Sequence, residues 1–282
     1  MNKIGIIVNI DKDKDLSITK NIINWIGERG GTILLSKSIA SKLNLKQYSY
    51  KTEDIYKQSD FILVLGGDGT ILGVSREVSK YDTPLLGINL GHLGFLAEVE
   101  VKEIFESLEK TLNGEFHIEN RIMLEAKVAE NGIFKKFYAL NDIAFTRGTL
   151  SRILRLKVYI NDDYVTSLSG DGLIIASPTG STAYSLSAGG PIISPNLSVM
   201  TLTPICPHSL FNKSIVISDS ETVRVDLEEN YGNAYLTVDG QEGYKINEGQ
   251  YVSISKAPFC TRLIKLSNRT FYDVLRTKIT ER

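Results

Sequence analysis

The first 113 residues alternate short apolar runs typical of strands with segments whose apolar side chains recur at helical spacing. The strand candidates are residues 3–9, 32–36, 61–65 and 85–89. The helical patterns cover residues 18–26, 71–79 and 101–113. Strands that alternate with helices form a parallel sheet covered by helices. The sequence therefore predicts an α/β domain with a parallel sheet over residues 1–115.

Beyond Gly114 the apolar spacing changes towards the alternation typical of strands. The strand candidates are residues 121–129, 137–144, 155–160, 172–176, 214–218, 222–227, 234–238 and 251–255. Many short strands separated by turn residues predict a sandwich or a folded-over sheet, here a mostly β domain over residues 116–265. Residues 178–190 predict a loop that leads into a short helix. We expect the tail, residues 266–282, to pack back on the first domain.

One stretch of the first part shows no clear pattern. Tyr48, Tyr50 and Tyr56 lie in a Lys/Ser-rich stretch before the strand candidate at residues 61–65. We interpret this stretch as a mobile surface segment and not as a platform for stacked bases.

The charge balance argues against a polyanionic partner. The chain has 32 Lys and Arg against 33 Asp and Glu, a formal net charge of −1, so it has no basic footprint for nucleic acid or an anionic membrane. No apolar stretch approaches the ~18 residues that a transmembrane helix needs. We therefore expect a cytoplasmic protein that binds neither nucleic acid nor membrane, in which local groups hold any bound phosphate.

A glycine-rich pentapeptide, Gly66-Gly67-Asp68-Gly69-Thr70, directly follows one strand candidate and precedes a helix. In that setting backbone amides and a helix N-terminus bind anions, and glycines let the main chain approach a phosphate. A tight turn without a ligand fits the pentapeptide equally well. Asp68 favours the functional interpretation, because a carboxylate among phosphates is unfavourable unless it accepts a hydroxyl proton or holds Mg²⁺.

A second segment, residues 169–191, is rich in small and hydroxyl-bearing side chains and contains an apolar strand candidate. It offers hydroxyl groups at Thr179, Ser181 and Thr182 and an aromatic face at Tyr184. A flat ring could lie against the backbone of such a segment. The alternative is a Gly/Ser-rich surface loop, which accounts poorly for so many small residues beside an apolar strand.

Asn141 and Asp142 are adjacent in the sequence. A carboxamide and a carboxylate together can bind a ribose diol or a nicotinamide amide, whereas a turn at a strand end is the alternative interpretation. Arg147 and Arg152 follow closely and could neutralise phosphates, but solvated surface arginines are the commoner case, so neither is assigned to the site.

These segments resemble one family. The pentapeptide is similar to the GGDGT loop of a kinase superfamily that includes NAD kinases, diacylglycerol and sphingosine kinases and, more distantly, phosphofructokinases. Residues 171–191 resemble the long NAD kinase signature D-G-hydrophobic-T-P-T-G-S-T-A-Y-x-x-S-A-G-G-P. Residues 91–96 (GHLGFL), 202–210 (LTPICPHSL) and 239–241 (DGQ) resemble further segments of that family. The resemblance thus covers almost the whole chain.

The resemblance implies an N-terminal α/β domain and a C-terminal β domain with the active site between them. It implies transfer of the γ-phosphoryl group of ATP to the 2′-hydroxyl of the adenosine ribose of NAD, with Asp68 accepting or orienting the hydroxyl proton. The donor phosphates would lie over Gly66, Gly67, Gly69 and Thr70. They would also hold Mg²⁺, for which no protein side chain is assigned as a ligand. The family implies a homodimer or homotetramer.

The resemblance also implies how NAD is bound. Phe95, Thr182 and Ala183 would lie on the adenine side, and Asp171, Tyr184 and Asp142 on the nicotinamide side. The positions carried over from the family as binding NAD are Asp68, Gly69, Phe95, Asn141, Asp142, Asp171, Thr179, Thr182, Ala183, Tyr184, Ser187 and Gln241.

Three positions depart from the family pattern. Asp142 stands where the family has Glu, which shortens the side chain by one methylene. Ser177 replaces the first Thr of the signature and keeps its hydroxyl. Residues 211–214 (FNKS) replace the Arg-Pro pair that commonly follows Leu210, so the role of that arginine falls to other groups.

Two other functions share part of this sequence pattern. A lipid kinase of the same superfamily would share the glycine loop but would need a broad apolar pocket, which the polar segment at residues 178–190 disfavours. A non-catalytic dinucleotide-binding regulator would not need a carboxylate such as Asp68 among the phosphates. Formation of NADP from NAD, ATP and Mg²⁺, dependent on Asp68, separates the three.

Overall fold

The structure, a computed structural model, describes residues 3–91, 94–130, 133–148, 153–208, 212–228, 234–247, 249–267 and 269–280. It consists of two compact units. Unit 1 contains Met1–Asn120 and Cys260–Arg282, and unit 2 contains Arg121–Phe259. Within the ranges described, no helix is long and apolar enough to cross a membrane.

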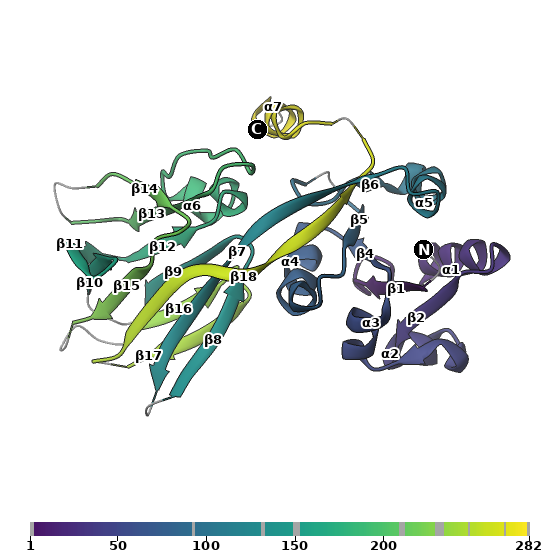
Figure 1. Ribbon diagram of the computed structural model, residues 1–282, viewed down its shortest axis with the longest axis horizontal. Helices are drawn as coiled ribbons and strands as arrows, with labels where there is room; N and C mark the ends of the chain where they lie inside the picture. The colour runs from purple at the N-terminus through teal and green to yellow at the C-terminus, as the bar shows by residue number, and fades with distance from the viewer. Residues whose placement is uncertain are drawn as a thin grey trace. The chain divides into compact units, whose positions relative to one another are not determined.

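Unit 1 is built on a parallel sheet, as predicted (Figure 1). Its strands are β1 Lys3–Val8, β2 Thr32–Ser36, β3 Ser49–Tyr50, β4 Phe61–Gly66, β5 Leu85–Asn89 and β6 Val99–Glu100. They lie in the order β5-β4-β1-β2-β3, with β6 beside β5, and all these pairs are parallel. The chain leaves β1 for β2 on one side and later enters β4 on the other. The strand order therefore reverses between β1 and β4.

Helices cover both faces of this sheet. Unit 1 contains the helices α1 Ser17–Glu28, α2 Lys37–Lys42, α3 Thr52–Gln58, α4 Asp68–Val78 and α5 Ile104–Leu112, with short 3₁₀ turns η1 Lys46–Tyr48, η2 Ser79–Tyr81 and η3 Val101–Glu103. The last helix, α7 Phe271–Thr280, does not belong to these sheet-covering layers. Apolar residues of α1 and α5 share one buried cluster with alternate residues of the strands, among them Ile26, Leu108, Ile6 and Leu63. On the other face, side chains of α3 and α4 approach Gly5 and Gly87 of the strands so closely that an added Cβ would collide with them.

The loop between β1 and α1 has a fixed conformation. The buried Asp13 carboxylate accepts hydrogen bonds from the backbone N–H groups of Ile18 (3.3 Å) and Thr19 (3.0 Å) and from the Thr19 hydroxyl (2.6 Å). It thereby binds N–H groups in the first turn of α1 that have no partner within the helix.

The stretch around Tyr48, Tyr50 and Tyr56 is not the mobile surface segment that we expected. It forms η1, β3 and α3, and the side chains of Ile55 and Tyr56 are 0% and 8% exposed. These two residues anchor a helix of seven residues, which is too short for a helical period to stand out in the sequence.

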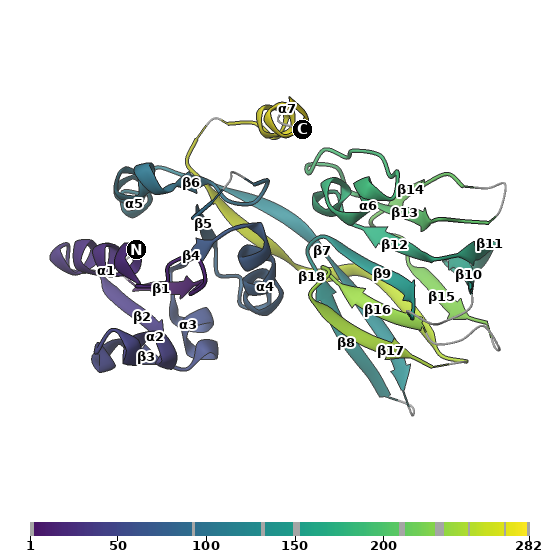
Figure 2. The same cartoon turned by 180° about the vertical axis from the view of Figure 1, so that it is seen from behind.

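Unit 2 is a mostly antiparallel β structure (Figure 2). Its strands are β7 His117–Glu130, β8 Ile133–Ala139, β9 Asp142–Arg147, β10 Leu154–Ile160, β11 Asp163–Gly170, β12 Gly172–Ala176, β13 Val199–Ile205, β14 Ile215–Ser218, β15 Val223–Leu227, β16 Ala234–Val238, β17 Glu242–Ile246 and β18 Tyr251–Lys265. Residues 117–120 of β7 and 260–265 of β18 belong to unit 1. One sheet has the order β14-β13-β12-β9-β16-β17, and the other includes β11-β10-β15-β18, with β7 and β8 beyond β18.

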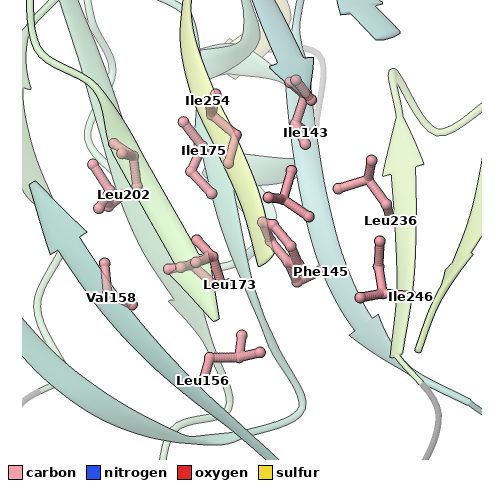
Figure 3. Close-up of a cluster of buried hydrophobic side chains, with 14 of the residues drawn as sticks. Ile143, Phe145, Leu156, Val158, Leu173, Ile175, Leu202, Leu236, Ile246 and Ile254 are labelled. Atoms are coloured by element: carbon pink, nitrogen blue, oxygen red, sulfur yellow. The ribbon is translucent and has the colours of Figure 1, made fainter. Parts of the chain in front are cut away.

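The two sheets of unit 2 share one apolar core, which makes the unit a sandwich. The cluster combines Phe145 and Leu173 from one sheet with Leu156 and Ile254 from the other (Figure 3). After β12 the chain forms η4 Thr179–Thr182 and α6 Tyr184–Ser187, as predicted for residues 178–190.

One predicted strand of unit 2 was wrong. Residues 137–144 do not form a single strand but span the end of β8 and the start of β9. At the break, the Asp239 carboxylate accepts hydrogen bonds from the N–H groups of Leu140, Asn141 and Asp142 at 2.7–3.2 Å. The turn therefore depends on a residue almost one hundred positions away, which local sequence patterns do not reveal.

Glu98, which precedes β6, holds the segment that follows β18 within unit 1. Its buried carboxylate accepts hydrogen bonds from Leu266 N–H (3.0 Å), Ser267 N–H (2.9 Å) and the Ser267 hydroxyl (2.8 Å), and it pairs with the Lys265 ammonium. Burial by itself would raise the pKa of Glu98. The charge of Lys265 and these hydrogen bonds outweigh burial and hold the pKa of Glu98 below its usual range.

We expect Glu98→Ala to lower the free energy of unfolding by about 3–5 kcal/mol, because it leaves the Lys265 ammonium largely buried without its partner. The pKa of Glu98 is lower in the folded state, so the wild type loses this stabilisation as the pH falls through the acid range, and the difference between the proteins should shrink there. Urea denaturation at neutral and acid pH measures both effects. Glu106→Ala removes an exposed pair with Lys110 and serves as control. Equal losses in the two variants would contradict the role of Glu98.

Candidate active site

In unit 1, three loops leave the carboxyl ends of neighbouring parallel strands. They follow β1 at residues 9–16, β4 at residue 67 and β5 at residues 90–98. The first two flank the position where the strand order reverses between β1 and β4. Open parallel sheets bind ligands at the carboxyl ends of their strands, at such a reversal point.

The glycine loop connects β4 directly to α4. Gly67 precedes the first residue of the helix in an extended conformation (φ −160°, ψ −174°), and its carbonyl accepts hydrogen bonds from Thr70 N–H (2.9 Å) and Ile71 N–H (3.1 Å). A Cβ on Gly66 would collide with the Thr70 side chain. The Thr70 hydroxyl accepts a hydrogen bond from the Asn9 side chain at 3.2 Å, which links this loop to the one after β1.

Asp68, the first residue of α4, is bound to the loop after β5. Its Oδ2 accepts a hydrogen bond from Phe95 N–H (2.7 Å), and its Oδ1 accepts from Leu96 N–H and Ala97 N–H (3.2 Å each). A Cβ on Gly94 would collide with this carboxylate, so only glycine fits there. A carboxylate has about four lone-pair positions. Three are used here, and Oδ2 retains one for a further donor.

The loop after β5 carries Phe95, the residue carried over as an adenine contact. Its half-buried ring packs against Phe271 of α7, with ring centroids 5.8 Å apart and planes tilted by 39°. Two residues of the same motif, His92 and Leu93, lie outside the described residues. Phe95 is therefore held by its backbone bond to Asp68 and by the aromatic contact with α7.

In unit 2, Asn141 and Asp142 lie at the start of β9, where Asp239 holds their backbone N–H groups. The side chain of Asp142 is buried, and the residue is 3% exposed. Burial, followed by the negative charge of Asp239, raises the pKa of Asp142 to about 7. Neither sequence pattern nor resemblance had assigned a role to Asp239, although it begins the DGQ turn; its carboxylate positions the pair.

Ser177 carries the turn that faces this pair. Its hydroxyl donates to the Leu140 carbonyl (2.5 Å) and accepts from Gly180 N–H (3.2 Å), and its N–H donates to the Asn141 carbonyl (2.9 Å). Gly180 packs so closely on Asn141 that an added Cβ would collide with its backbone. The hydroxyl of Ser177, the residue that replaces the family threonine, therefore forms hydrogen bonds within the protein.

The small-residue segment divides into buried and exposed positions. Thr179 and Ser181 are buried, and their hydroxyl groups bond within unit 2: Thr179 accepts from Arg121 (3.2 Å), and Ser181 donates to the Pro178 carbonyl (2.7 Å). Tyr184 and Ser187 are exposed, while Thr182 and Ala183 are half-buried. The exposed and half-buried positions are the ones that a ligand can reach.

Asp171 and Arg147 form an ion pair that the sequence did not suggest. Arg147 Nε donates to Asp171 Oδ1 at 2.7 Å, so Arg147 lies on the surface, as interpreted from the sequence, but is also paired there with Asp171. Burial raises the pKa of the Tyr184 hydroxyl, and the charges of Asp142, Cys206 and Asp171 raise it further. The phenol thus lies within electrostatic reach of both carboxylates. Gln241 is exposed at the turn between β16 and β17, and Arg152 lies outside the described residues.

Asp142→Asn should change how stability depends on pH. The pKa of Asp142 rises from about 4 in the unfolded chain to about 7 in the fold, so the folded protein binds the proton more tightly. Stability should therefore fall as the pH rises through this interval, by about 2–4 kcal/mol. The variant should lack this fall and exceed the wild type in stability above it. Urea denaturation across the interval measures this, with Asp163→Asn, an exposed residue, as control. Parallel profiles for Asp142→Asn and the wild type would contradict the shift.

Comparisons with known proteins agree with this arrangement. The family model for the ATP-NAD kinase N-terminal domain matches residues 4–116, and that for the ATP-NAD kinase C-terminal domain matches residues 140–266. The chain is 49% identical to the NAD kinase of Caldanaerobacter subterraneus subsp. tengcongensis over 100% of both chains. It is 42% identical to the NAD kinase of Syntrophotalea carbinolica, over 99% of this chain and 98% of the relative.

Solved structures share the fold. Yeast NADH kinase complexed with NADH gives a TM-score of 0.86 at 25% identity, over 98% of this chain and 86% of that one. An NAD kinase from Archaeoglobus fulgidus in complex with ATP gives a TM-score of 0.78 at 24% identity, over 99% of each chain. The chain is 49% identical to a curated NAD kinase over its full length, and it matches the family models of both NAD kinase domains. It therefore belongs to the NAD kinase family, and its activity is NAD kinase activity, a phosphoryl transfer.

Proposed function

We propose that the glycine loop of unit 1 is where ATP gives its γ-phosphoryl group to the 2′-hydroxyl of the adenosine ribose of NAD. One observation carries this assignment. Asp68 stands at the N-terminus of α4, with three lone-pair positions fixed by backbone N–H groups and one left on Oδ2. A hydroxyl that donates to this position is oriented by a carboxylate that cannot rotate away.

The donor phosphates are assigned to Gly66, Gly67, Gly69 and Thr70. The start of α4 directs backbone N–H groups and the positive end of the helix dipole towards its N-terminus, which favours anions. Gly67 carries no side chain that would keep a phosphate from the backbone. The Thr70 hydroxyl accepts its bond from Asn9, so its own proton remains available for a phosphate oxygen.

Asp68 acts on the acceptor hydroxyl. Phosphoryl transfer depends mainly on in-line positioning and charge neutralisation. The backbone N–H groups that bind Asp68 fix the orientation of its carboxylate, so that Oδ2 is placed as a hydrogen-bond acceptor for the hydroxyl. Asp68 therefore orients the 2′-hydroxyl and accepts its proton as the bond to phosphorus forms.

Unit 2 supplies groups for the dinucleotide. Tyr184 and Ser187 are accessible for a ring and a polar group, and Asn141 is held in place by Asp239. Thr182 and Ala183 provide a small half-buried surface, which we assign to the adenine of NAD. Thr179 and Asp142 are buried, so they shape the site more than they contact NAD in this conformation. Asp171 and Gln241 complete the proposed set.

Mg²⁺ is the divalent cation that we propose for the reaction. The proposed ligands of this cation are chiefly donor phosphate oxygens and water, the usual ligands of Mg²⁺ in phosphoryl-transfer enzymes. When bound, the cation would neutralise charge on the phosphates.

The family resemblance supports a homodimer or homotetramer as the active form, and the sequence supports a cytoplasmic location. Both are part of the proposal. Light scattering on the purified protein measures the oligomeric state.

Asp68→Asn should reduce turnover at least ~10²-fold, as expected for a lost general base, while most NAD binding is retained. The assay measures NADP with an NADP-specific dehydrogenase. Asp82→Asn makes the same charge change at an exposed residue of unit 1 and should leave turnover unchanged. Turnover could fall because the loop at residues 95–97 is disturbed or because Asp68 no longer accepts the hydroxyl proton. Hydrogen exchange at residues 95–97 separates these causes, since unchanged protection assigns the lost turnover to the hydroxyl contact. Turnover within a few-fold of the wild type would remove Asp68 from the mechanism.

A further inference from the structure

The side chain of Lys12 lies over the glycine loop. A Cβ built on Gly67 would be only 2.7 Å from Lys12 Nζ, and one built on Gly91 would be 3.6 Å from it. The ammonium therefore occupies the space beside Gly67, close to the loop after β5. Neither the sequence patterns nor the family resemblance had singled out this residue.

The loop that carries Lys12 is held at both ends. The N–H groups of Lys12 and Asp13 both donate to the Asn9 carbonyl at 3.1 Å, and the Asn9 side chain donates to Thr70 at 3.2 Å. Further along, the buried Asp13 carboxylate binds the first turn of α1. The backbone at Lys12 is thus attached to the glycine loop itself, which explains why its side chain crosses that loop.

No carboxylate of the described residues forms an ion pair with the Lys12 ammonium, and the residue is exposed to solvent. The Asp68 carboxylate, at the start of α4, directs its oxygens to the N–H groups of residues 95–97. An ammonium beside a glycine loop and a helix N-terminus attracts an anion, and a lysine in such a loop acts on phosphates as a point charge.

We propose that Lys12 binds the phosphate chain of ATP, at the oxygens of the phosphoryl group being transferred. This inference rests on the proposed function of the glycine loop. Negative charge on those oxygens has to be neutralised during transfer, and the backbone N–H groups of the loop carry only partial charges. Lys12 supplies a full positive charge from the loop that follows β1, on the β1 side of the reversal point between β1 and β4. Asn9 then acts as a positioning residue for it.

The test compares Lys12→Gln, Lys12→Arg and Lys14→Gln in the full chain. Lys14 is a neighbouring exposed lysine of the same loop, so its variant controls for net charge. We expect Lys12→Gln to lower kcat/KM for ATP by about 10- to 10²-fold, the value of a lost charged hydrogen bond, with KM for NAD and the thermal midpoint unchanged. Lys12→Arg should recover part of the loss, and Lys14→Gln should match the wild type.

Two results would overturn the inference. The first is a kcat/KM for ATP in Lys12→Gln that lies within about three-fold of the wild type. A change this small is below the cost of a lost charged hydrogen bond and would show that the ammonium does not contact the donor. Equal losses for ATP and NAD, with no recovery in Lys12→Arg, would show a structural role for the loop. An inactive wild type would instead contradict the proposed function itself, so the two failures are distinguishable.

Discussion

The hydrogen bonds between the Asp68 carboxylate and the backbone of residues 95–97 are the interaction on which the rest of the active-site loop structure depends. They join the loop after β4 to the loop after β5, and they require glycine at position 94. Because both oxygens are engaged, the carboxylate has one orientation. The chemistry assigned to Asp68 and the conformation of the Phe95 loop are therefore consequences of the same contact.

Unit 2 uses a similar device. Asp239 accepts hydrogen bonds from the backbone N–H groups of residues 140–142 and so fixes the turn that presents Asn141 and Asp142. Its negative charge, added to burial, keeps the pKa of Asp142 near neutrality. In each unit, then, one carboxylate organises the backbone of a loop that carries residues assigned to NAD.

The sequence predicted the elements that are determined by the residues within them. Residues 32–36, 85–89, 172–176 and 234–238 were predicted as strands with the bounds that the structure shows, because each is an apolar β-rich run. The strand predicted at residues 137–144 failed because its break depends on Asp239. The helix at Thr52–Gln58 was missed because its identity depends on burying Ile55 and Tyr56 against the sheet.

The same distinction holds for the candidate site. The glycine loop and the 169–191 segment are continuous motifs and could be recognised from the sequence. Lys12 and the Arg147–Asp171 pair could not, because each acquires its place only when distant strands are brought together. A charged residue in an acidic, unpatterned loop such as residues 11–15 carries no sequence signal for phosphate binding.

The most direct test of the account asks which hydroxyl receives the phosphoryl group. An NAD analogue that lacks only the adenosine 2′-hydroxyl keeps the other contacts of the dinucleotide. It should inhibit competitively and bind more weakly than NAD by tens-fold at most, since one lost hydroxyl costs about 0.5–1.5 kcal/mol, or up to ~3 if Asp68 is left unpaired. Mass spectrometry should detect phosphorylated NAD and no phosphorylated analogue. A phosphorylated product from the 2′-deoxy analogue would show that another hydroxyl is the acceptor and would contradict the placement of the 2′-hydroxyl at Asp68.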